Sequence, residues 1–277
     1  MALKRVVCAL VLSSCATFKP VTVVAAGDIS LAEVSERPKL TADLVESLKP
    51  EAVIALGDLQ YNDGALELFE SIYGPAWGRF KDKTYPAVGN HEYKTPGASG
   101  YFTYFGARAG DPTRGYYSYE LGAWHVVVLN TSELCQQVSC EPDGEQVKWL
   151  EADLSANTKK CVMAYWHYPR FSSGKHGNFD KAAPFWKVLA AHHATLVLTG
   201  HEHFYERLRP IDGITQITVG TGGAQFADYA DIHPSSLARD NTTLGVLKLV
   251  LSDGSWSAEF IGVPGSTFHD FDSGACR

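Results

Sequence analysis

The chain has no run of basic residues of the kind that binds nucleic acid. Its 277 residues include 24 Lys and Arg against 31 Asp and Glu, which gives a formal net charge of −7. Basic residues are adjacent only at Lys4–Arg5 and Lys159–Lys160. We therefore expect no binding of a nucleic-acid polymer. A protein of this charge that handles anions needs a local positive centre, and a bound metal ion would supply one.

Long hydrophobic runs are also missing beyond the first 14 residues, so the sequence predicts no membrane-spanning helix there. Internal repeats, low-complexity blocks and a linker between domains are absent as well. A hydrophobic fraction of 45% with 20% charged residues is ordinary for a chain that buries a full core. Residues 21–277 are therefore expected to form one domain.

The first 15 residues have the layout of an export signal. Met1–Arg5 is a short basic start, Val6–Leu12 is an apolar run too short to span a bilayer, and small residues precede Cys15. The sequence Leu-Ser-Ser-Cys resembles the cleavage box of bacterial lipoproteins, which implies a signal segment over residues 1–14 and a lipid on Cys15. A plain or truncated signal peptide and a frayed terminal strand are the alternatives. We expect an exported protein of the cell envelope or the extracellular space, with lipid anchoring left open.

The four cysteines beyond this segment are even in number, which suits an oxidising compartment. None of them has the paired spacing of a structural zinc site. We predict that Cys135 and Cys140 close a short loop. Cys161 and Cys276 would then tie the C-terminal tail to a core strand.

Apolar runs of strand length alternate with segments of helical periodicity. The expected strands are Val21–Ala26, Ala52–Leu56, Tyr85–Val88, Tyr116–Glu120, Trp124–Leu129, Cys161–Tyr165, Ala194–Leu198, Ile214–Val219, Leu244–Leu251 and Trp256–Ile261. The expected helices are Thr41–Leu48, Ala65–Tyr73, Asp143–Leu154 and Asp180–His192, and residues 92–114 are expected to form an ordered loop. This pattern predicts an α/β fold with four layers, α/β/β/α, in which helices cover two mixed sheets.

Several of these strands end in residues that can bind a metal ion. These residues are Asp28, Asp58, Asn90, His167 and the pair His201 and His203. Residues two apart in an extended segment face the same side, so the two paired histidines can point into one pocket. Open α/β sheets bind ligands at the carboxyl ends of their strands. Carboxylates neutralise hard cations, histidines favour transition metals, and two ions about 3.5–4 Å apart can clamp a phosphoryl group. The strand ends therefore predict a two-metal site.

Five short blocks resemble, in their order along the chain, the signature of the calcineurin-like metallophosphoesterases. The blocks are Gly27-Asp28, Gly57-Asp58, Gly89-Asn90-His91-Glu92, His167 and Gly200-His201-Glu202-His203. Two extended blocks look like the purple acid phosphatase branch, namely Gly57-Asp58-Leu59-Gln60-Tyr61 and Phe204-Tyr205-Glu206-Arg207. The resemblance spans Val21 to Gly223 and is to the compact one-domain members, without the N-terminal β-sandwich of the large plant enzymes.

This resemblance implies two metal ions that share one bridging carboxylate. The implied ligands of the first, a ferric ion, are Asp28, Tyr61 and His203. The implied ligands of the second, which would be Zn²⁺, Mn²⁺ or Fe²⁺, are Asn90, His167 and His201. Asp58 would bridge the two ions.

The same resemblance implies hydrolysis of small phosphate monoesters by a hydroxide that the metal pair activates. His91 would stabilise or protonate the leaving oxygen, and His176, nine residues after His167, would hold the substrate. A phosphodiesterase or nucleotide hydrolase that uses the same metals is the first alternative. A non-catalytic surface lipoprotein that binds metal is the second.

Other polar residues near these motifs are expected to have structural roles. Glu92 and Glu202 should orient ligands without binding metal themselves. Arg207 should pair with a carboxylate, and His125, on an apolar strand, should be a hydrogen-bonded residue of the core or its edge.

Overall fold

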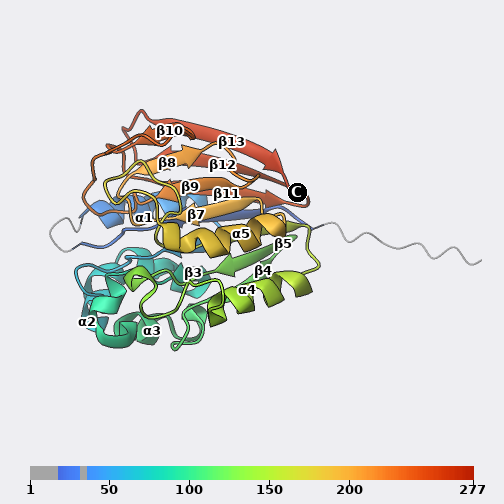
Figure 1. The fold of residues 1–277 in the computed structure, drawn as a ribbon. Helices are drawn as coiled ribbons and strands as arrows, with labels where there is room; N and C mark the ends of the chain where they lie inside the picture. Colours follow the sequence, from blue (N-terminus) through green and yellow to red (C-terminus); the bar gives the residue numbers. More distant parts are fainter. Residues whose placement is uncertain (1–17, 32–35) are drawn as a thin grey trace, which may run out of the picture.

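Two mixed β-sheets that pack against each other form the centre of the molecule (Figure 1). The computed structural model describes residues 18–31 and 36–277. The expected signal segment over residues 1–14 and the expected lipid site at Cys15 lie outside the described residues. In the part of the chain that is described, no helix has the length and apolar character needed to cross a membrane.

The first sheet joins the beginning of the chain to its end. Its strands lie in the order β13–β12–β11–β1–β2–β3. Strands β1, β2 and β3 are parallel to one another, whereas β11, β12 and β13 are antiparallel to their neighbours. The strands are β1 Val21–Ala26, β2 Ala52–Leu56, β3 Thr84–Ala87, β11 Gly245–Ser252, β12 Ser255–Gly262 and β13 His269–Ala275.

The second sheet contains the middle of the chain, in the order β10–β8–β9–β7–β6–β5–β4. Strands β5, β6, β7 and β9 are parallel, and β4, β8 and β10 pair antiparallel. The strands are β4 Tyr117–Leu121, β5 Trp124–Val128, β6 Cys161–Tyr165, β7 Leu196–Thr199, β8 Tyr205–Leu208, β9 Thr215–Val219 and β10 Ser236–Asp240.

Side chains on the central strands of the second sheet alternate between two cores. Val126 and Val128 of β5 belong to the core shared with the first sheet. Val127 belongs to the core under helices α4 (Glu145–Ala156) and α5 (Ala183–Ala191). Because successive residues of a strand face opposite sides, a strand buried on both faces is a continuous apolar run. This is why the sequence predicts these strands so directly.

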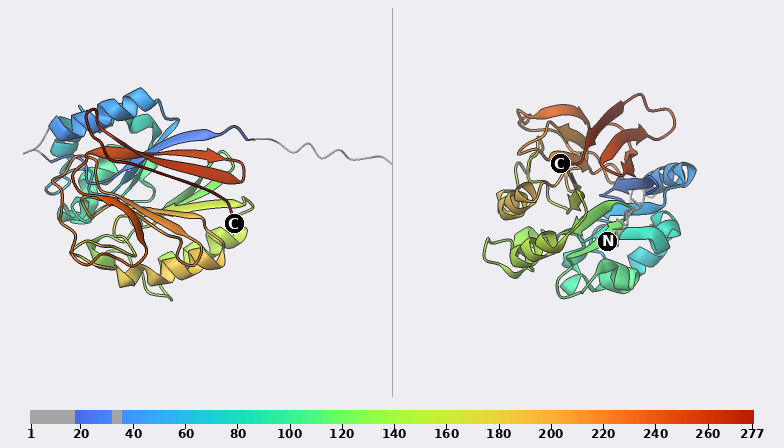
Figure 2. Two further views of the ribbon diagram at one scale, coloured as in Figure 1. Left: turned by 90° about the horizontal axis from the view of Figure 1, so that it is seen from above. Right: turned by 90° about the vertical axis from the view of Figure 1, so that its right-hand side faces the viewer.

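Helices cover the outer faces of the two sheets. Helix α1 (Glu36–Leu48) packs on the first sheet, and α4 and α5 cover the second. The left view of Figure 2 shows α1, in blue, and α5, in yellow, on opposite sides of the paired sheets. The layers are therefore α/β/β/α, and the predicted fold class is confirmed.

The prediction of a loop over residues 92–114 is wrong. The segment contains helix α3 (Ser99–Phe105), with short 3-10 helices before and after it. Glycines at both ends, Gly97 and Gly106, have positive φ and delimit the helix without preventing it. Buried aromatic side chains, Tyr101 and Phe105 among them, stabilise a helix that is too short to persist on propensity alone.

The remaining helices are short, and η3 and η6 contact strands β2 and β3 of the first sheet. They are α2 Leu66–Leu68, the π-helix η2 Phe69–Tyr73, and the 3-10 helices η3 Trp77–Lys83, η4 Glu92–Lys94, η5 Pro96–Ala98, η6 Gly106–Ala109, η7 Glu133–Cys135 and η8 Asp180–Ala182.

Three strands, β8, β10 and β13, were not predicted from the sequence. Strands β10 and β13 are the outer edges of their sheets. Their residues alternate between exposed and half-buried, and the largest apolar side chain of β13, Phe271, is 55% exposed. An edge strand with no buried face lacks the apolar signal on which the prediction rests.

Covalent and ionic links connect the two sheets. Both predicted disulfides, Cys135–Cys140 and Cys161–Cys276, are present, and the second ties β6 to the residue after β13. Arg207 of β8 donates from Nε and Nη2 to the two oxygens of Asp270 on β13, at 2.7 and 2.9 Å. The expected pairing of Arg207 with a carboxylate is confirmed, and this bidentate ion pair joins β8 of the second sheet to the edge strand β13 of the first.

His125 of β5 lies between two carboxylates from different elements. Its Nδ1 is 2.8 Å from Oε1 of Glu120 on β4, and its Nε2 is 2.6 Å from Oδ2 of Asp153 on α4. Burial lowers the pKa of His125, but the two contacts outweigh burial and raise the pKa above its ordinary value. His125 is therefore the hydrogen-bonded residue that its strand position predicted, and its charged form clamps α4 to the sheet.

We expect His125→Gln to destabilise the protein more at about pH 5.5 than at about pH 8.5. Because the folded state holds the histidine proton more tightly, the stabilisation is complete below the unfolded pKa of about 6.5 and is lost as pH rises through the raised folded pKa. Hydrogen bonds to a charged group contribute about 1.5–3 kcal/mol each, so the loss should be about 2 kcal/mol greater at the lower pH. Urea unfolding measures the difference. The exposed His269→Gln serves as control, and equal losses at both pH values would contradict the prediction.

Candidate metal centre

Three of the expected ligands have a left-handed backbone conformation at the ends of their strands. Asp28 follows β1, Asp58 follows β2 and His201 follows β7, with φ values of 58°, 49° and 69°. Such values are rare for residues with a side chain and cluster at functional sites. Gly57 has a φ of 84°, and a Cβ there would lie 2.5 Å from Nδ1 of His167. Only glycine lets the end of β2 approach this histidine so closely.

A single hydroxyl stands at the centre of the first group of expected ligands. Tyr61 donates from Oη to Oδ1 of Asp28 at 2.8 Å. The same oxygen lies 3.1 Å from Oδ2 of Asp58 and 2.9 Å from Nε2 of His203. The N–H at Nδ1 of His203 donates to the carbonyl of Gln225 at 2.6 Å, so Nε2 of the neutral ring presents a lone pair. One hydroxyl proton thus faces three acceptor atoms.

The second group of expected ligands shares Asp58 with the first. One ligand atom each from Asp58, His167 and His201 lie within 4.8 Å of one another. Nε2 of His167 is 3.2 Å from Oδ2 of Asp58, the same oxygen that faces Tyr61. The N–H at Nδ1 of His167 donates to the carbonyl of Leu56 at 2.8 Å, which turns Nε2, the nitrogen that would bind a metal ion, toward the centre.

In this second group, the buried Oδ1 of Asn90 has no hydrogen-bond partner among the described residues, and Nε2 of His167 has only Oδ2 of Asp58 nearby, at 3.2 Å. Buried polar atoms are nearly always paired, and leaving one unpaired costs about 1–3 kcal/mol. An imidazole nitrogen and an amide oxygen are both electron-pair donors that a cation can satisfy together. The side chains present therefore fit a bound metal ion at this position.

The electrostatics of the site favour added positive charge. Burial opposes the charged form of His167, but Asp58 outweighs burial and raises the pKa of His167 to about 9. Burial likewise opposes charge on His203, and its contact with Asp28 raises the pKa overall. Burial and the nearby His167 lower the pKa of His201 well below its ordinary range, so this ring is neutral with a lone pair available. The carboxylates thus raise the proton affinity of His167 and His203, and bound metal ions would replace those protons.

The pKa values of the two central oxygen ligands, Asp58 and Tyr61, shift in opposite directions. Burial opposes ionisation of Asp58, yet the charge of His167 brings the pKa of Asp58 well below its ordinary range. Burial, together with Asp28 and Asp58, raises the pKa of Tyr61 well above its ordinary range. Tyr61 can therefore become a tyrosinate only with a cation next to its oxygen.

Glu92, fully buried, holds the backbone that carries Asp58. Its Oε2 accepts from the N–H groups of Asp58 and Gly89 at 3.0 and 2.7 Å. Its Oε1 accepts from Leu59 and Gln60 at 2.8 and 3.2 Å. Burial and the charge of Asp58 raise the pKa of Glu92 to about 7, although the N–H groups favour the carboxylate. Glu92 thus has the orienting contacts that the sequence predicted for it.

His91 borders the centre from the side of Tyr61, whose ring centroid lies 4.3 Å from that of His91. Its Nε2 is 3.9 Å from Oδ2 of Asp58, and the N–H at Nδ1 donates to the carbonyl of Asn62 at 2.7 Å. Nζ of Lys94 lies 2.9 and 3.3 Å from the two ring nitrogens. Burial lowers the pKa of His91, and the ammonium group of Lys94 adds to this effect. Sequence analysis missed Lys94, because nothing in its spacing shows that it folds back onto His91.

His176 borders the second group of ligands. Its ring lies 4.6 Å from that of His201, and its Nδ1 is 3.2 Å from Oε1 of the buried Glu202. Its side chain is 58% exposed, so it faces solvent as well as the centre. The structure therefore brings all seven expected ligands, with His91 and His176, to one edge of the paired sheets.

Comparison with known proteins agrees with this geometry. The profile of the calcineurin-like phosphoesterase family matches residues 21–205. Purple acid phosphatase 18 from Arabidopsis thaliana is 26% identical, over 74% of this chain and 50% of that protein, so the chain spans about half the length of this relative.

Two solved structures share the fold at low sequence identity. A purple acid phosphatase from yellow lupin (Lupinus luteus) seeds has a TM-score of 0.79 at 18% identity, covering 92% of this chain and 53% of that one. GAP50, the anchor in the inner membrane complex of Plasmodium, has a TM-score of 0.73 at 13% identity, covering 93% of this chain and 89% of that one.

We expect Glu92→Gln to lower both the free energy of unfolding and the affinity for metal. The new amide group would turn an N–H donor toward two backbone N–H groups, at a cost of about 2–4 kcal/mol. Urea unfolding and titration of the metal-free protein with Zn²⁺ measure the two effects. Glu67→Gln, at an exposed glutamate, is the matched control. If Glu92→Gln behaves like this control in both assays, the orienting role of Glu92 is wrong.

Proposed function

The chain belongs to the calcineurin-like phosphoesterase family, and we propose that it is a phosphomonoesterase of the purple acid phosphatase type that holds two metal ions. The observation that carries this proposal is the position of Oδ2 of Asp58. This oxygen faces Oη of Tyr61 at 3.1 Å and Nε2 of His167 at 3.2 Å, so it lies between the two groups of ligands. A carboxylate in that position suits a bridge between two neighbouring cations.

The chemistry of the two groups suits two different ions. Asp28, Tyr61 and His203 combine a carboxylate, a phenol and an imidazole, which we assign to Fe³⁺. Asn90, His167 and His201 offer an amide oxygen and two imidazoles, which we assign to Zn²⁺, Mn²⁺ or Fe²⁺. When bound, the metal pair would lower the pKa of a water molecule and neutralise charge on the phosphoryl oxygens.

The protein's own side chains would bind and orient the ester beside these ligands. His91 is placed beside the leaving oxygen, and its charged form, with a proton on Nε2, would hydrogen-bond that oxygen and give it the proton. Lys94 adds a positive charge next to His91, and this charge favours an anionic substrate in a protein whose net charge is −7. His176, beside His201, is exposed enough to meet substrate from the other group of ligands. These groups act on the phosphoryl oxygens, where charge stabilisation contributes most to phosphoryl transfer.

We also propose that the partner of this site is a small phosphorylated compound and that the protein acts after export. The two disulfides support an oxidising compartment. Lipidation of Cys15 and the signal segment over residues 1–14 stay predictions.

Two other functions use the same fold. A phosphodiesterase or nucleotide hydrolase would need the same metals, and turnover of p-nitrophenyl phosphate against bis-p-nitrophenyl phosphate separates it from a monoesterase. A non-catalytic role is the second alternative, since a shared fold does not imply a shared activity. The full ligand set and His91 favour an enzyme, and a metal-loaded protein that hydrolyses neither ester would favour the non-catalytic role.

We expect His91→Ala to lower kcat for p-nitrophenyl phosphate by about 100-fold or more, because a positioned acid–base group contributes about that much. Metal content, measured by elemental analysis, should stay at the wild-type level, because the assigned ligands are intact. His269→Ala, at an exposed histidine on β13, is the control and should leave kcat unchanged. Unchanged turnover in His91→Ala would refute the role assigned to His91.

We expect the iron-loaded protein to absorb visible light through a bond between Tyr61 and Fe³⁺, and Tyr61→Phe to abolish this absorption. The substitution removes only the oxygen that the other first-group ligands surround. Absorption spectra recorded together with iron content measure the effect. A colourless wild-type protein with a full complement of iron would contradict Tyr61 as a ligand.

A further inference from the structure

A cavity of about 410 Å³ opens next to the second group of ligands, where Asn90 and His201 form part of its wall. This volume lies in the range of small-molecule sites, roughly 300–1,000 Å³. The rest of the wall is formed by His176 and Gly177 and by a mainly apolar part, which consists of Leu134, Tyr168, Pro169 and Phe179. Among the described residues that line the cavity, none carries a carboxylate or an ammonium group.

The aromatic part of the wall extends directly from the candidate metal centre. The rings of Tyr168 and Phe179 are stacked, with centroids 4.9 Å apart and planes at 25°. The ring of Tyr168 also lies 4.0 Å from that of His201. A planar group held on this surface would therefore be within reach of a phosphate at the centre.

Leu134, which completes the wall, has an exposed side chain and an unusual backbone conformation. Its side chain is 44% exposed, although a leucine gains nothing from water, and its φ is 54°, in the left-handed region that leucine rarely adopts. Backbone strain of this kind persists only where the surroundings enforce it, and it points to a function.

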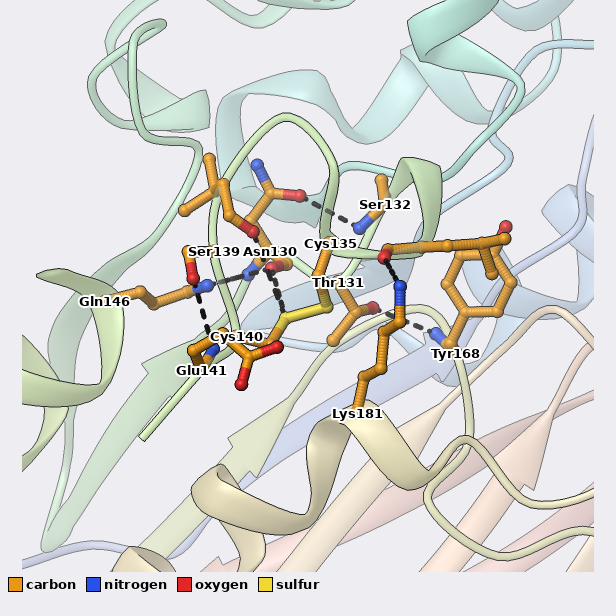
Figure 3. The surroundings of a disulfide bond; sticks show 12 residues. Asn130, Thr131, Ser132, Cys135, Ser139, Cys140, Glu141, Gln146, Tyr168 and Lys181 are labelled. Atoms are coloured by element: carbon orange, nitrogen blue, oxygen red, sulfur yellow. Dashed lines mark hydrogen bonds between the residues drawn. A yellow bond between two sulfur atoms is a disulfide. The ribbon is translucent and has the colours of Figure 1, made fainter. Parts of the chain in front are cut away.

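The surroundings of Leu134 do enforce its position. The next residue, Cys135, is bonded to Cys140, and Nζ of Lys181 donates to the carbonyl of Leu134 at 2.9 Å. Figure 3 shows the disulfide with Lys181 on one side of the loop and Tyr168 next to it. The backbone N–H of Tyr168 donates to Oγ1 of Thr131 at 3.2 Å, so the loop is fixed to the segment that carries the aromatic wall.

We propose that Leu134, Tyr168 and Phe179 form a leaving-group pocket that selects phosphate monoesters with a planar aromatic ring over esters of polyols. This inference rests on the proposed function, because the pocket acts on the alcohol of the ester that the metal centre would cleave. Apolar contact with Leu134 and stacking on the ring pair stabilise an aromatic alcohol. A polyol loses hydration against the side chains of Leu134 and Phe179, which offer it no hydrogen bond.

The disulfide then has a positioning role in substrate selection. Because the Cys135–Cys140 bond holds the loop that carries Leu134, its removal should weaken selection without touching any assigned metal ligand. Aryl phosphates carry an aromatic ring directly on the ester oxygen, whereas nucleoside monophosphates carry one beyond the ribose. The two sources differ in the distance between ring and phosphorus, so they can be distinguished by assay.

The test compares kcat/KM for phenyl phosphate, AMP and glycerol 2-phosphate in wild type and in Leu134→Ala. Loss of apolar contact in a substrate pocket changes selectivity by about tenfold, so the ratio of phenyl phosphate to glycerol 2-phosphate should fall about tenfold. The fall should appear mainly in KM, since the contact is made equally before and during the reaction. If kcat/KM for AMP falls in Leu134→Ala as it does for phenyl phosphate, the pocket also binds nucleosides. If kcat/KM for AMP changes no more than that for glycerol 2-phosphate, the pocket binds aryl groups alone.

Leu40→Ala is the matched control, because Leu40 on α1 is 46% exposed and does not line the cavity. It should leave the ratio unchanged. Phe179→Leu and the double change Cys135→Ser/Cys140→Ser should lower the ratio in the same direction as Leu134→Ala. In the same variants, the preference for phenylphosphonate over methylphosphonate as an inhibitor should fall together with this ratio. Because neither phosphonate is hydrolysed, this comparison measures binding alone. Thermal melting of each variant checks that it is folded.

The outcomes separate the two levels of inference. If the wild-type protein hydrolyses all three esters and every folded variant keeps the wild-type ratio, the pocket is wrong and the proposed function stands. If the metal-loaded wild-type protein hydrolyses none of them, the proposed function fails. The pocket is then overturned as well unless phenylphosphonate still binds more tightly than methylphosphonate and loses that preference in Leu134→Ala.

Discussion

Crowding of buried carboxylates around one point is the constraint on which the rest of the structure depends. Asp28 and Asp58 are both buried, and like charges brought together out of water repel. Each uses one oxygen to accept a backbone N–H, from His201 and His91 respectively, both at 2.8 Å. The other oxygen of each faces Tyr61. The fold therefore stabilises half of each carboxylate and leaves the other half available to a cation.

This arrangement requires both sheets in a fixed relation. The first sheet supplies Asp28 and Asp58 from the ends of β1 and β2, and the second supplies His167 and His201 from the ends of β6 and β7. A small slip between the sheets would separate the carboxylates from the histidines. The shared core opposes such a slip, and so do the Cys161–Cys276 disulfide and the ion pair that joins β8 to β13. Links far from the centre thus contribute to its geometry.

The sequence predicted those parts of the molecule whose signal is local. Strands buried on both faces are apolar runs, so β1, β2 and β5 to β7 could be located, and the residues that follow them could be placed at one edge. The edge strands β10 and β13 could not be located, because their polar residues resemble a loop until pairing is known.

What the sequence could not show is long-range geometry. The carbonyls of Leu56 and Gln225 orient His167 and His203, but any residue type offers a carbonyl. Lys94 folds back onto His91 through a short 3-10 helix within a segment predicted to be a loop. Leu134 has no periodic pattern around it, and its importance becomes visible only with the cavity and the disulfide in place.

Under the proposed function, the metal ligands and the residue proposed to select the alcohol are therefore held by separate parts of the structure. The assigned ligands lie at strand ends whose backbone is fixed by sheet packing and by the contacts of Glu92. Leu134 lies on a loop that is fixed by a disulfide and by Lys181 and that contributes no assigned ligand. Since the two supports are separate, the proposal implies that a change in the loop would alter which alcohol is accepted while the strand ends stay in place. Under the proposed function, this separation would let one metal-binding edge serve different phosphate esters, which is one reason why fold similarity alone does not identify a substrate.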